Sequence, residues 1–255
     1  MFDSTVYSNR RKALLEKMTA SRGLAVFVGN MDAAMNYRGN DYKFRQDSNF
    51  MYFWGIDEPA FAAIIDLDNG TECLYGNDVD IDDIIWMGPQ PLLKDKAEKV
   101  GVHKTDLLSS LDLYVAKAVA GGRRVHFLPP YRYHNMIQIN RMLGIPFGDM
   151  KRSASEDFIK GVVSLRLIKQ ECEIAEIEKA CDIGYEMHYN AMKMMRLGMV
   201  EQELVGVMEG ISISKGLMPS FPIILSQNGE TLHNHSHHQI LTQGRLVVID
   251  AGAET

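Results

Sequence analysis

The sequence is poor in cysteine and has no apolar run long enough to cross a bilayer. Its three cysteines, Cys73, Cys172 and Cys181, are an odd number without Cys-x-x-Cys spacing. This count argues against a disulfide framework and against a structural zinc site. The first residues lack the basic and then apolar pattern of a signal peptide. We therefore expect a cytoplasmic protein with reduced thiols and no membrane partner.

Basic charge is also scarce. The 27 Lys and Arg are outnumbered by 33 Asp and Glu, which gives a formal net charge of −6 at pH 7. Nucleic acid is not an expected partner, because phosphate binding requires clustered Lys and Arg. The hydrophobic fraction of 46% is that of an ordinary globular protein, and 255 residues are enough for two domains.

Several short catalytic motifs are missing. The chain has no GxxxxGK[ST] phosphate loop, no HExxH zinc helix and no GxSxG nucleophile elbow. These absences argue against the enzyme classes that depend on those motifs.

Apolar runs alternate with helical spacings over the first part of the chain. We expect strands at 23–29, 61–65, 72–75 and 124–128, and helices over 5–20, much of 81–118, and 135–143. Asn69-Gly70 predicts a tight hairpin turn, because these residues readily adopt positive φ angles. The alternation predicts an α/β domain with a largely parallel sheet that also holds one hairpin.

The pattern changes after about residue 153. We expect helices over 170–196 and 201–214, followed by strands at 221–225 and 246–249. The sequence is therefore divided into two domains, residues 1–160 and residues 161–255.

A carboxylate follows the last predicted strand. The apolar run 246–249 leads into Asp250, and the small residues Ala251 and Gly252 come next. A carboxylate on a rigid strand end, with space beside it, suits a hard divalent cation. Aspartates at strand ends also commonly cap turns, so both interpretations remain open.

Histidines gather between residues 233 and 238, where four of the eight in the chain are found. On a strand, His233, His235 and His237 would share one face and could hold a divalent ion. An exposed polar loop is the alternative, and the residues alone favour it.

The stretch from Tyr42 to Pro59 is dense in aromatic residues. It is interpreted as a core strand whose rings pack beneath helices, with Gly55 and Glu58-Pro59 turning the chain. The alternative is a wall or subunit contact near a substrate pocket, because exposed aromatic clusters mark interfaces.

Three separated segments together resemble Xaa-Pro aminopeptidases and prolidases, the creatinase-like metallopeptidases. The first segment reads Phe44-Arg45-Gln46-x-Ser48-x-Phe50-x-Tyr52-Phe53-x-Gly55-x-x-Glu58-Pro59. The second is Leu165-Arg166-Leu167-Ile168-Lys169, followed by Glu171. The third comprises Pro219-Ser220-Phe221, Asn228-Gly229, Leu232-His233 and Val248-Ile249-Asp250-Ala251-Gly252.

This resemblance implies a creatinase/aminopeptidase P-type N-terminal α/β domain, followed by the first part of an α+β pita-bread catalytic domain. It implies a metal-dependent aminopeptidase that releases the N-terminal residue from peptides with proline at the second position. In that family two divalent ions, usually manganese, activate a water molecule, and the subunits form oligomers. We therefore expect a peptide substrate, an Mn²⁺ cofactor and a homo-oligomer.

The resemblance also assigns roles to three residues. Asp250 matches the first metal-binding aspartate of the family, and His233 matches a catalytic histidine that lies beside the metals. Trp86 resembles a tryptophan of the N-terminal domain that contacts substrate in a neighbouring subunit's pocket.

The family's second aspartate, its ligand histidine and both glutamates have no counterpart before Thr255. We therefore expect a chain truncated within the catalytic domain and inactive by itself. The sequence leaves three alternatives: a non-catalytic pseudo-peptidase that serves as a binding module, a prolidase that cleaves Xaa-Pro dipeptides, and a creatinase-related hydrolase of small molecules.

Overall fold

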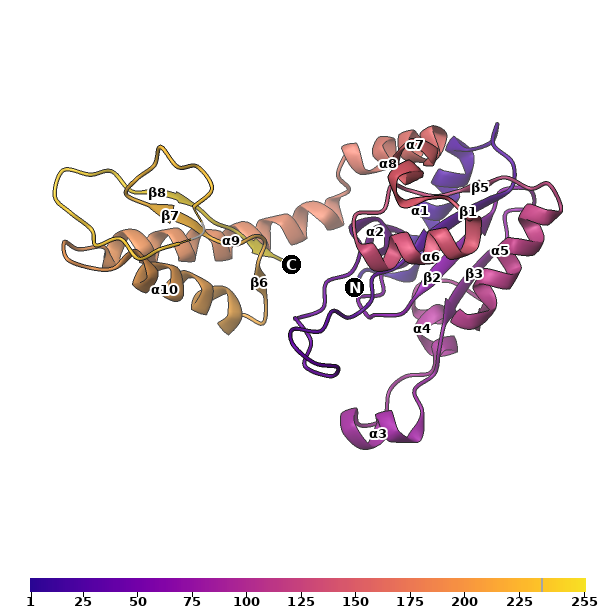
Figure 1. Cartoon of the computed structure of the whole chain (residues 1–255), viewed down its shortest axis with the longest axis horizontal. Coiled ribbons are helices and arrows are strands. Elements are labelled where there is room, and N and C mark those ends of the chain that lie inside the picture. Colours follow the sequence, from indigo (N-terminus) through magenta and orange to yellow (C-terminus); the bar gives the residue numbers. More distant parts are fainter. Residues whose placement is uncertain (235) are drawn as a thin grey trace. The chain divides into compact units, whose positions relative to one another are not determined.

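The computed structural model of the chain divides into two compact units, Met1–Ile168 and Lys169–Thr255 (Figure 1). It describes residues 1–234 and 236–255. The first unit extends past the predicted division at residue 160, because helix α8 (Glu156–Leu167) packs into its core through Phe158 and Val162. No helix within the described residues is long and apolar enough to cross a membrane.

The first unit is built on a five-stranded sheet in the order β4-β3-β2-β1-β5. Its strands are β1 (Leu24–Val28), β2 (Ala62–Asp66), β3 (Glu72–Gly76), β4 (Thr105–Leu107) and β5 (Val125–His126). β1 pairs with β5 and β3 with β4 in parallel, whereas β2 is antiparallel to both of its neighbours. The expected α/β architecture is confirmed. The expectation of a largely parallel sheet is wrong. The segment after β1 brings the chain back into the sheet at the end where β1 finishes, so β2 runs in the opposite direction.

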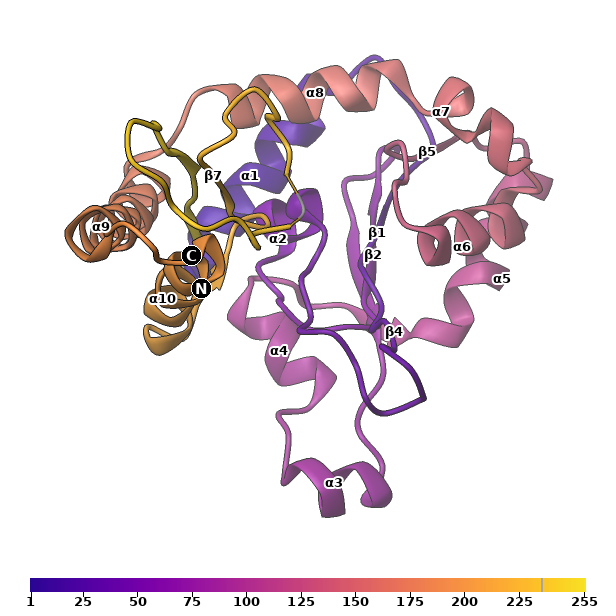
Figure 2. The ribbon, with the colours of Figure 1, turned by 60° about the vertical axis from the view of Figure 1, so that its left-hand side comes forward.

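Helices cover both faces of this sheet, with α1, α2 and α8 on one side and α5 and α6 on the other (Figure 2). The helices of this unit are α1 (Ser4–Lys17), α2 (Ser48–Trp54), α3 (Ile81–Met87), α4 (Leu93–Lys99), α5 (Leu111–Ala120), α6 (Tyr133–Leu143), α7 (Met150–Ser153) and α8. Alternate residues of β1 serve the two faces: Ala25 and Phe27 pack in one core, Leu24 and Val26 in the other. Burial on both sides explains why these strands are continuous apolar runs.

The aromatic stretch forms a helix rather than the expected strand. The Asp47 side chain accepts hydrogen bonds from the backbone N–H groups of Asn49 and Phe50, and thereby begins α2. Gly55 ends the helix in the left-handed conformation, with φ of 63°. Phe53 and Trp54 are fully buried, so the expectation of a core position is confirmed for these rings.

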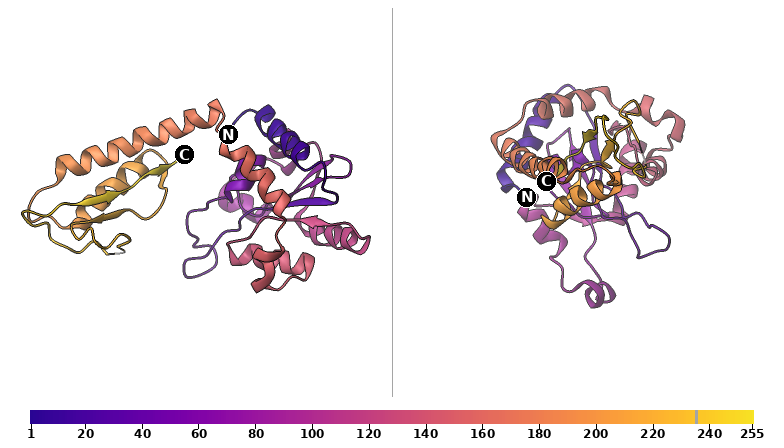
Figure 3. Two further views of the ribbon diagram at one scale, coloured as in Figure 1. Left: turned by 90° about the horizontal axis from the view of Figure 1, so that it is seen from above. Right: turned by 90° about the vertical axis from the view of Figure 1, so that its left-hand side faces the viewer.

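The described residues of the second unit form two helices and short strand pairs (Figure 3). Its elements are α9 (Glu171–Met194), α10 (Glu201–Ser214), β6 (Met218–Pro219), β7 (Ile224–Ser226), β8 (Val248–Asp250) and β9 (Ala253–Glu254). β6 pairs with β9 and β7 with β8, both antiparallel. The predicted helices are confirmed, the second with its bounds unchanged. The core between helices and strands contains Met187, Leu204, Met208 and Leu225.

Arg11 joins three segments at the centre of the first unit. Its side chain is fully buried, and its Nε lies 2.7 Å from an oxygen of Glu72 on β3. Nη1 donates to the carbonyl of Phe53 at 2.9 Å, and Nη2 donates to the carbonyl of Val100 at 3.0 Å. The guanidinium also lies over the Trp54 ring, 4.8 Å from its centroid. Burial lowers the pKa of Arg11 and the Glu72 carboxylate opposes that shift, so the buried charge depends on this pairing.

We expect Arg11→Met to destabilise the first unit by about 3 kcal/mol, because it leaves Glu72 unpaired and buried carbonyl groups without donors. The measurement is a urea unfolding curve followed by tryptophan fluorescence, since both tryptophans, Trp54 and Trp86, lie in this unit. The control is Lys12→Met, at an exposed position of the same helix. Equal losses for the two variants would contradict the assignment.

His126 links the stability of this unit to pH. Its imidazole is buried, with Nδ1 2.7 Å from Ser155 Oγ and Nε2 3.0 Å from the Arg22 carbonyl oxygen. Burial lowers the pKa of His126, and the hydrogen bond with Arg22 opposes this shift. An unfolded histidine titrates near pH ~6.5, so the unfolded state binds more protons below that pH. The stability contributed by neutral His126 is therefore complete above that value and is lost as pH falls toward the lower pKa of the folded state.

We expect the urea concentration at the unfolding midpoint to decrease as the pH is lowered from 7.5 to 5.5. The decrease should be smaller in His126→Gln than in the unchanged chain. Tryptophan fluorescence gives both midpoints. His134→Gln, at an exposed position, is the control and should leave the decline unchanged. An identical decline with and without His126 would rule out this residue as its source.

Candidate functional site

The second unit contains a pocket of about 350 Å³ beside the β7–β8 pair. Three apolar and three polar residues line it: Phe221, Pro222, Ile224, His233, Asn234 and Asp250. Two of the polar residues, Asp250 and His233, are those that the sequence assigned to metal binding and catalysis. The structure thus places both in one pocket.

Strand pairing positions Asp250. It is the last residue of β8, lies opposite Ile224 of β7 and is exposed. After Asp250 the chain bends past Ser220, whose backbone N–H donates to the Gly252 carbonyl at 2.9 Å. A Cβ atom on Gly252 would lie 3.0 Å from Ser220 Oγ, so glycine permits this close passage. The small residues after Asp250 thus keep the chain close to β6.

His233 lies in the segment that follows β7, and its side chain is exposed. This segment begins with a turn in which Thr231 N–H donates to the Asn228 carbonyl at 3.0 Å. A Cβ atom on Gly229 would lie 2.5 Å from a methyl carbon of Val248 on β8, so a larger residue here would have to displace the Val248 side chain. The turn therefore runs close over β8 before the chain reaches His233.

His237 and His238 lie in a loop and not on a strand. His237 Nδ1 lies 3.0 Å from the Leu225 carbonyl oxygen, and His238 contacts Ser236. His235 lies outside the described residues. The segment is a loop at the positions that the structure describes, which confirms the loop interpretation there.

The side-chain donor atoms of the described residues do not form a complete metal centre. No group of three or more His, Cys, Asp or Glu side chains among residues 1–234 and 236–255 lies close enough together to hold an ion. Divalent ions in proteins take at least four ligands, and Asp250 is one carboxylate. Asp250 therefore fits the role of a single ligand, but these residues do not supply a complete set.

Trp86 is in the first unit, on α3, with 87% of its side chain exposed. The pocket belongs to the second unit, and the predicted substrate contact of Trp86 stays a prediction.

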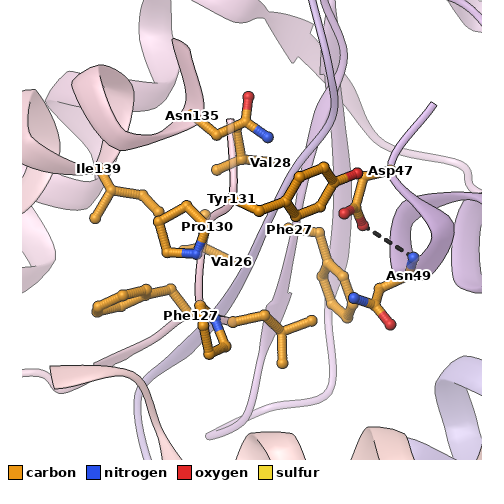
Figure 4. A pocket seen from close by; sticks show the side chains of 12 residues that line it. Val26, Phe27, Val28, Asp47, Asn49, Phe127, Pro130, Tyr131, Asn135 and Ile139 are labelled. Atoms are coloured by element: carbon orange, nitrogen blue, oxygen red, sulfur yellow. Dashed lines mark hydrogen bonds between the residues drawn. The ribbon is translucent and has the colours of Figure 1, made fainter. Parts of the chain in front are cut away.

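A second pocket, in the first unit, is too small to be a substrate site (Figure 4). It measures about 40 Å³ and lies where the parallel strands β1 and β5 end. That volume holds roughly one or two water molecules. Its one carboxylate, Asp47, is already bonded to the backbone of α2, as the dashed line in Figure 4 shows for Asn49.

Sequence reasoning did not single out Asn234, Pro222 or Ile224 as pocket residues. Phe221 appeared only within a motif. The closeness of His233 and Asn234 in the chain was the one available signal for Asn234.

Two family models match the chain. Residues 7–126 match the aminopeptidase P N-terminal domain, and residues 175–255 match metallopeptidase family M24. The curated relatives include the Xaa-Pro aminopeptidase of Escherichia coli K12, which is 28% identical over 97% of this chain and 58% of its own length. A probable Xaa-Pro aminopeptidase of Aspergillus terreus is 27% identical over 96% of this chain and 49% of its own length.

Solved structures agree with these relatives. A zinc-substituted E. coli aminopeptidase P in complex with product matches with a TM-score of 0.82 and 25% identity. The E. coli enzyme with the inhibitor Pro-Leu matches with a TM-score of 0.82 and 26% identity. Both matches cover 100% of this chain and 60% of the other. The chain thus spans somewhat more than half the length of the E. coli relative. The chain thus resembles an aminopeptidase P N-terminal domain over residues 7–126 and a segment of a metallopeptidase family M24 domain over residues 175–255, and the curated relatives that it matches are Xaa-Pro aminopeptidases.

Proposed function

We propose that this chain is part of a metal-dependent aminopeptidase that releases the N-terminal residue from peptides with proline at the second position. The observation that supports it most is the shared pocket. Asp250 and His233 come from separate segments of the chain, and the resemblance implies a role in the reaction for both. A pocket with an apolar wall and a few convergent polar groups is typical of a substrate site.

The cofactor of this proposal is a pair of divalent ions, with Mn²⁺ as the native metal. Such a pair lowers the pKa of a bound water and stabilises charge that develops on a substrate oxygen. Asp250 would supply one carboxylate ligand. The other ligands would come from outside these 255 residues, so the polypeptide 1–255 is expected to be inactive by itself.

The other pocket residues would bind the peptide. The exposed imidazole of His233 can donate a hydrogen bond to a substrate oxygen, and Phe221 and Ile224 offer apolar contact to the side chain or proline ring beside the cleaved bond. These contacts orient the substrate next to Asp250.

We further propose a cytoplasmic homo-oligomer. The exposed side chains of α3 include Ile81 at 75%, Ile85 at 72% and Trp86 at 87% exposure. An apolar cluster of this kind marks a contact surface. In such an oligomer Trp86 would contact the peptide bound by a neighbouring subunit.

Cys73, Cys172 and Cys181 are free thiols, in keeping with a reducing compartment.

The test uses a chain completed beyond Thr255 to the length of its relatives, with Mn²⁺ and a tripeptide that has proline in the middle. We expect Asp250→Asn to lower kcat/KM by more than ~100-fold and to reduce the bound Mn²⁺, because a ligand is lost. His233→Ala should lower kcat while Mn²⁺ is retained. Asp182→Asn, at an exposed position on α9, is the control.

Unchanged activity and metal content in Asp250→Asn would sink the proposal, as would hydrolysis by the polypeptide 1–255 alone. Cleavage of Xaa-Pro dipeptides in preference to the tripeptide would identify a prolidase instead.

A further inference from the structure

Glu201 is a fully buried carboxylate outside the pocket. It is the first residue of α10, where the positive end of the helix dipole favours a negative charge. The capping role at this helix belongs to Glu203 instead, whose side chain accepts the Val200 N–H at 2.7 Å. Burying a carboxylate is costly unless it is hydrogen-bonded. The contacts of Glu201 must therefore explain its position.

Glu201 holds the start of the loop after β7. Its Oε1 accepts the backbone N–H of Gln227 at 2.7 Å, in a buried hydrogen bond. Its second oxygen, Oε2, is buried and has no hydrogen-bond partner within the described ranges 1–234 and 236–255. The bond to Gln227 is thus the contact that fixes the side chain.

Gln227 in turn holds the end of the same loop. Its Nε2 donates to the Ile240 carbonyl at 2.7 Å. Its Oε1 accepts from Thr242 N–H at 3.0 Å and from Thr242 Oγ1 at 3.1 Å. Glu201, Gln227 and Thr242 form what we call the loop clamp, because they join the two ends of segment 227–242 to the start of α10.

The segment held in this way contains His233 and Asn234, which line the pocket. Asn234 Nδ2 donates to the Leu225 carbonyl at 2.9 Å, so the middle of the segment also returns to β7. Tying the ends of a loop reduces the number of conformations open to its middle. The distance between His233 and Asp250 therefore depends on the clamp.

We propose that Glu201 is a positioning residue, which through Gln227 sets the place of His233 beside Asp250. This inference rests on the proposed function of the pocket. A side chain misplaced by about 1 Å can lower a rate ~100-fold, so the contribution of Glu201 is measurable in catalysis although the residue touches no substrate.

The test compares Glu201→Met with Glu201→Gln in the completed, Mn²⁺-loaded chain. We expect Glu201→Met to lower kcat roughly 10- to 100-fold, because methionine cannot accept the Gln227 N–H. Glu201→Gln should stay within about threefold, since its carbonyl oxygen can still accept that hydrogen bond. A full loss in Glu201→Gln, or no loss in Glu201→Met, overturns the proposal.

A double variant separates positioning from general damage. If Glu201 acts through His233, Glu201→Met combined with His233→Ala should be no slower than His233→Ala alone. If the kcat losses of the two single variants multiply in the double variant, the proposal is contradicted. The matched control is Met208→Ala, a fully buried residue of the same helix, which should lower Tm by roughly 10 °C and leave kcat within about twofold. If Glu201→Met behaves like this control, its role is structural.

Amide hydrogen exchange tests the positioning role of Glu201 independently of the proposed peptidase function. In Glu201→Met we expect the Gln227 and Thr242 amides to exchange at least about tenfold faster and the His233 ring resonances to shift, with the Val205 amide of α10 unchanged. If the completed chain shows no Xaa-Pro activity, the proposed function fails, and the clamp is judged on these spectra. Unchanged exchange and unchanged His233 resonances overturn it.

Discussion

The candidate site depends on the pairing of β7 with β8. In this register Leu225 lies opposite Ile249, and Ile224 lies opposite Asp250. Leu225 and Ile249 pack in the core formed with α9 and α10, so the hydrophobic effect selects their side of the strands. Because neighbouring residues point to opposite faces, Asp250 is directed to the other face. A shift of β8 by one residue would turn Asp250 toward the core and Ile249 away from it.

The second constraint is the loop that brings His233 to the same place. Strand pairing cannot position it, because the loop lacks regular structure where it is described. The loop is held instead by the side-chain hydrogen bonds from Glu201 through Gln227 to Thr242, together with backbone bonds such as that from Glu201 N–H to the Gln239 carbonyl at 3.0 Å. Asp250 and His233 are therefore held by different interactions: Asp250 by strand pairing supported by apolar packing, and His233 by the partly buried hydrogen bonds of its loop.

Local signals in the sequence predicted much of the fold. The Asn69-Gly70 turn joins antiparallel strands as expected, with Gly70 at φ of 73°. The predicted helix over 201–214 has the bounds of α10. α2 was interpreted as a strand because its aromatic residues favour strands, whereas the Asp47 cap and Gly55 decided for a helix. The direction of β2 depends on a return of the chain that no local pattern encodes.

The site was predictable only in part. Asp250 and His233 were found because they stand in motifs that resemble a family, not because their residue types are diagnostic. Asn234 and Glu201 carried no such signal. Glu201 reads as an ordinary first-turn acid, and its burial appears only when the loop after β7 is folded over it.

The most direct measurement is anomalous diffraction at the manganese edge from crystals of the completed chain grown with Mn²⁺. We expect a peak about 2 Å from a carboxylate oxygen of Asp250, on the side of the pocket that faces His233. An active enzyme whose manganese peaks all lie away from Asp250 would show that Asp250 is not a metal ligand.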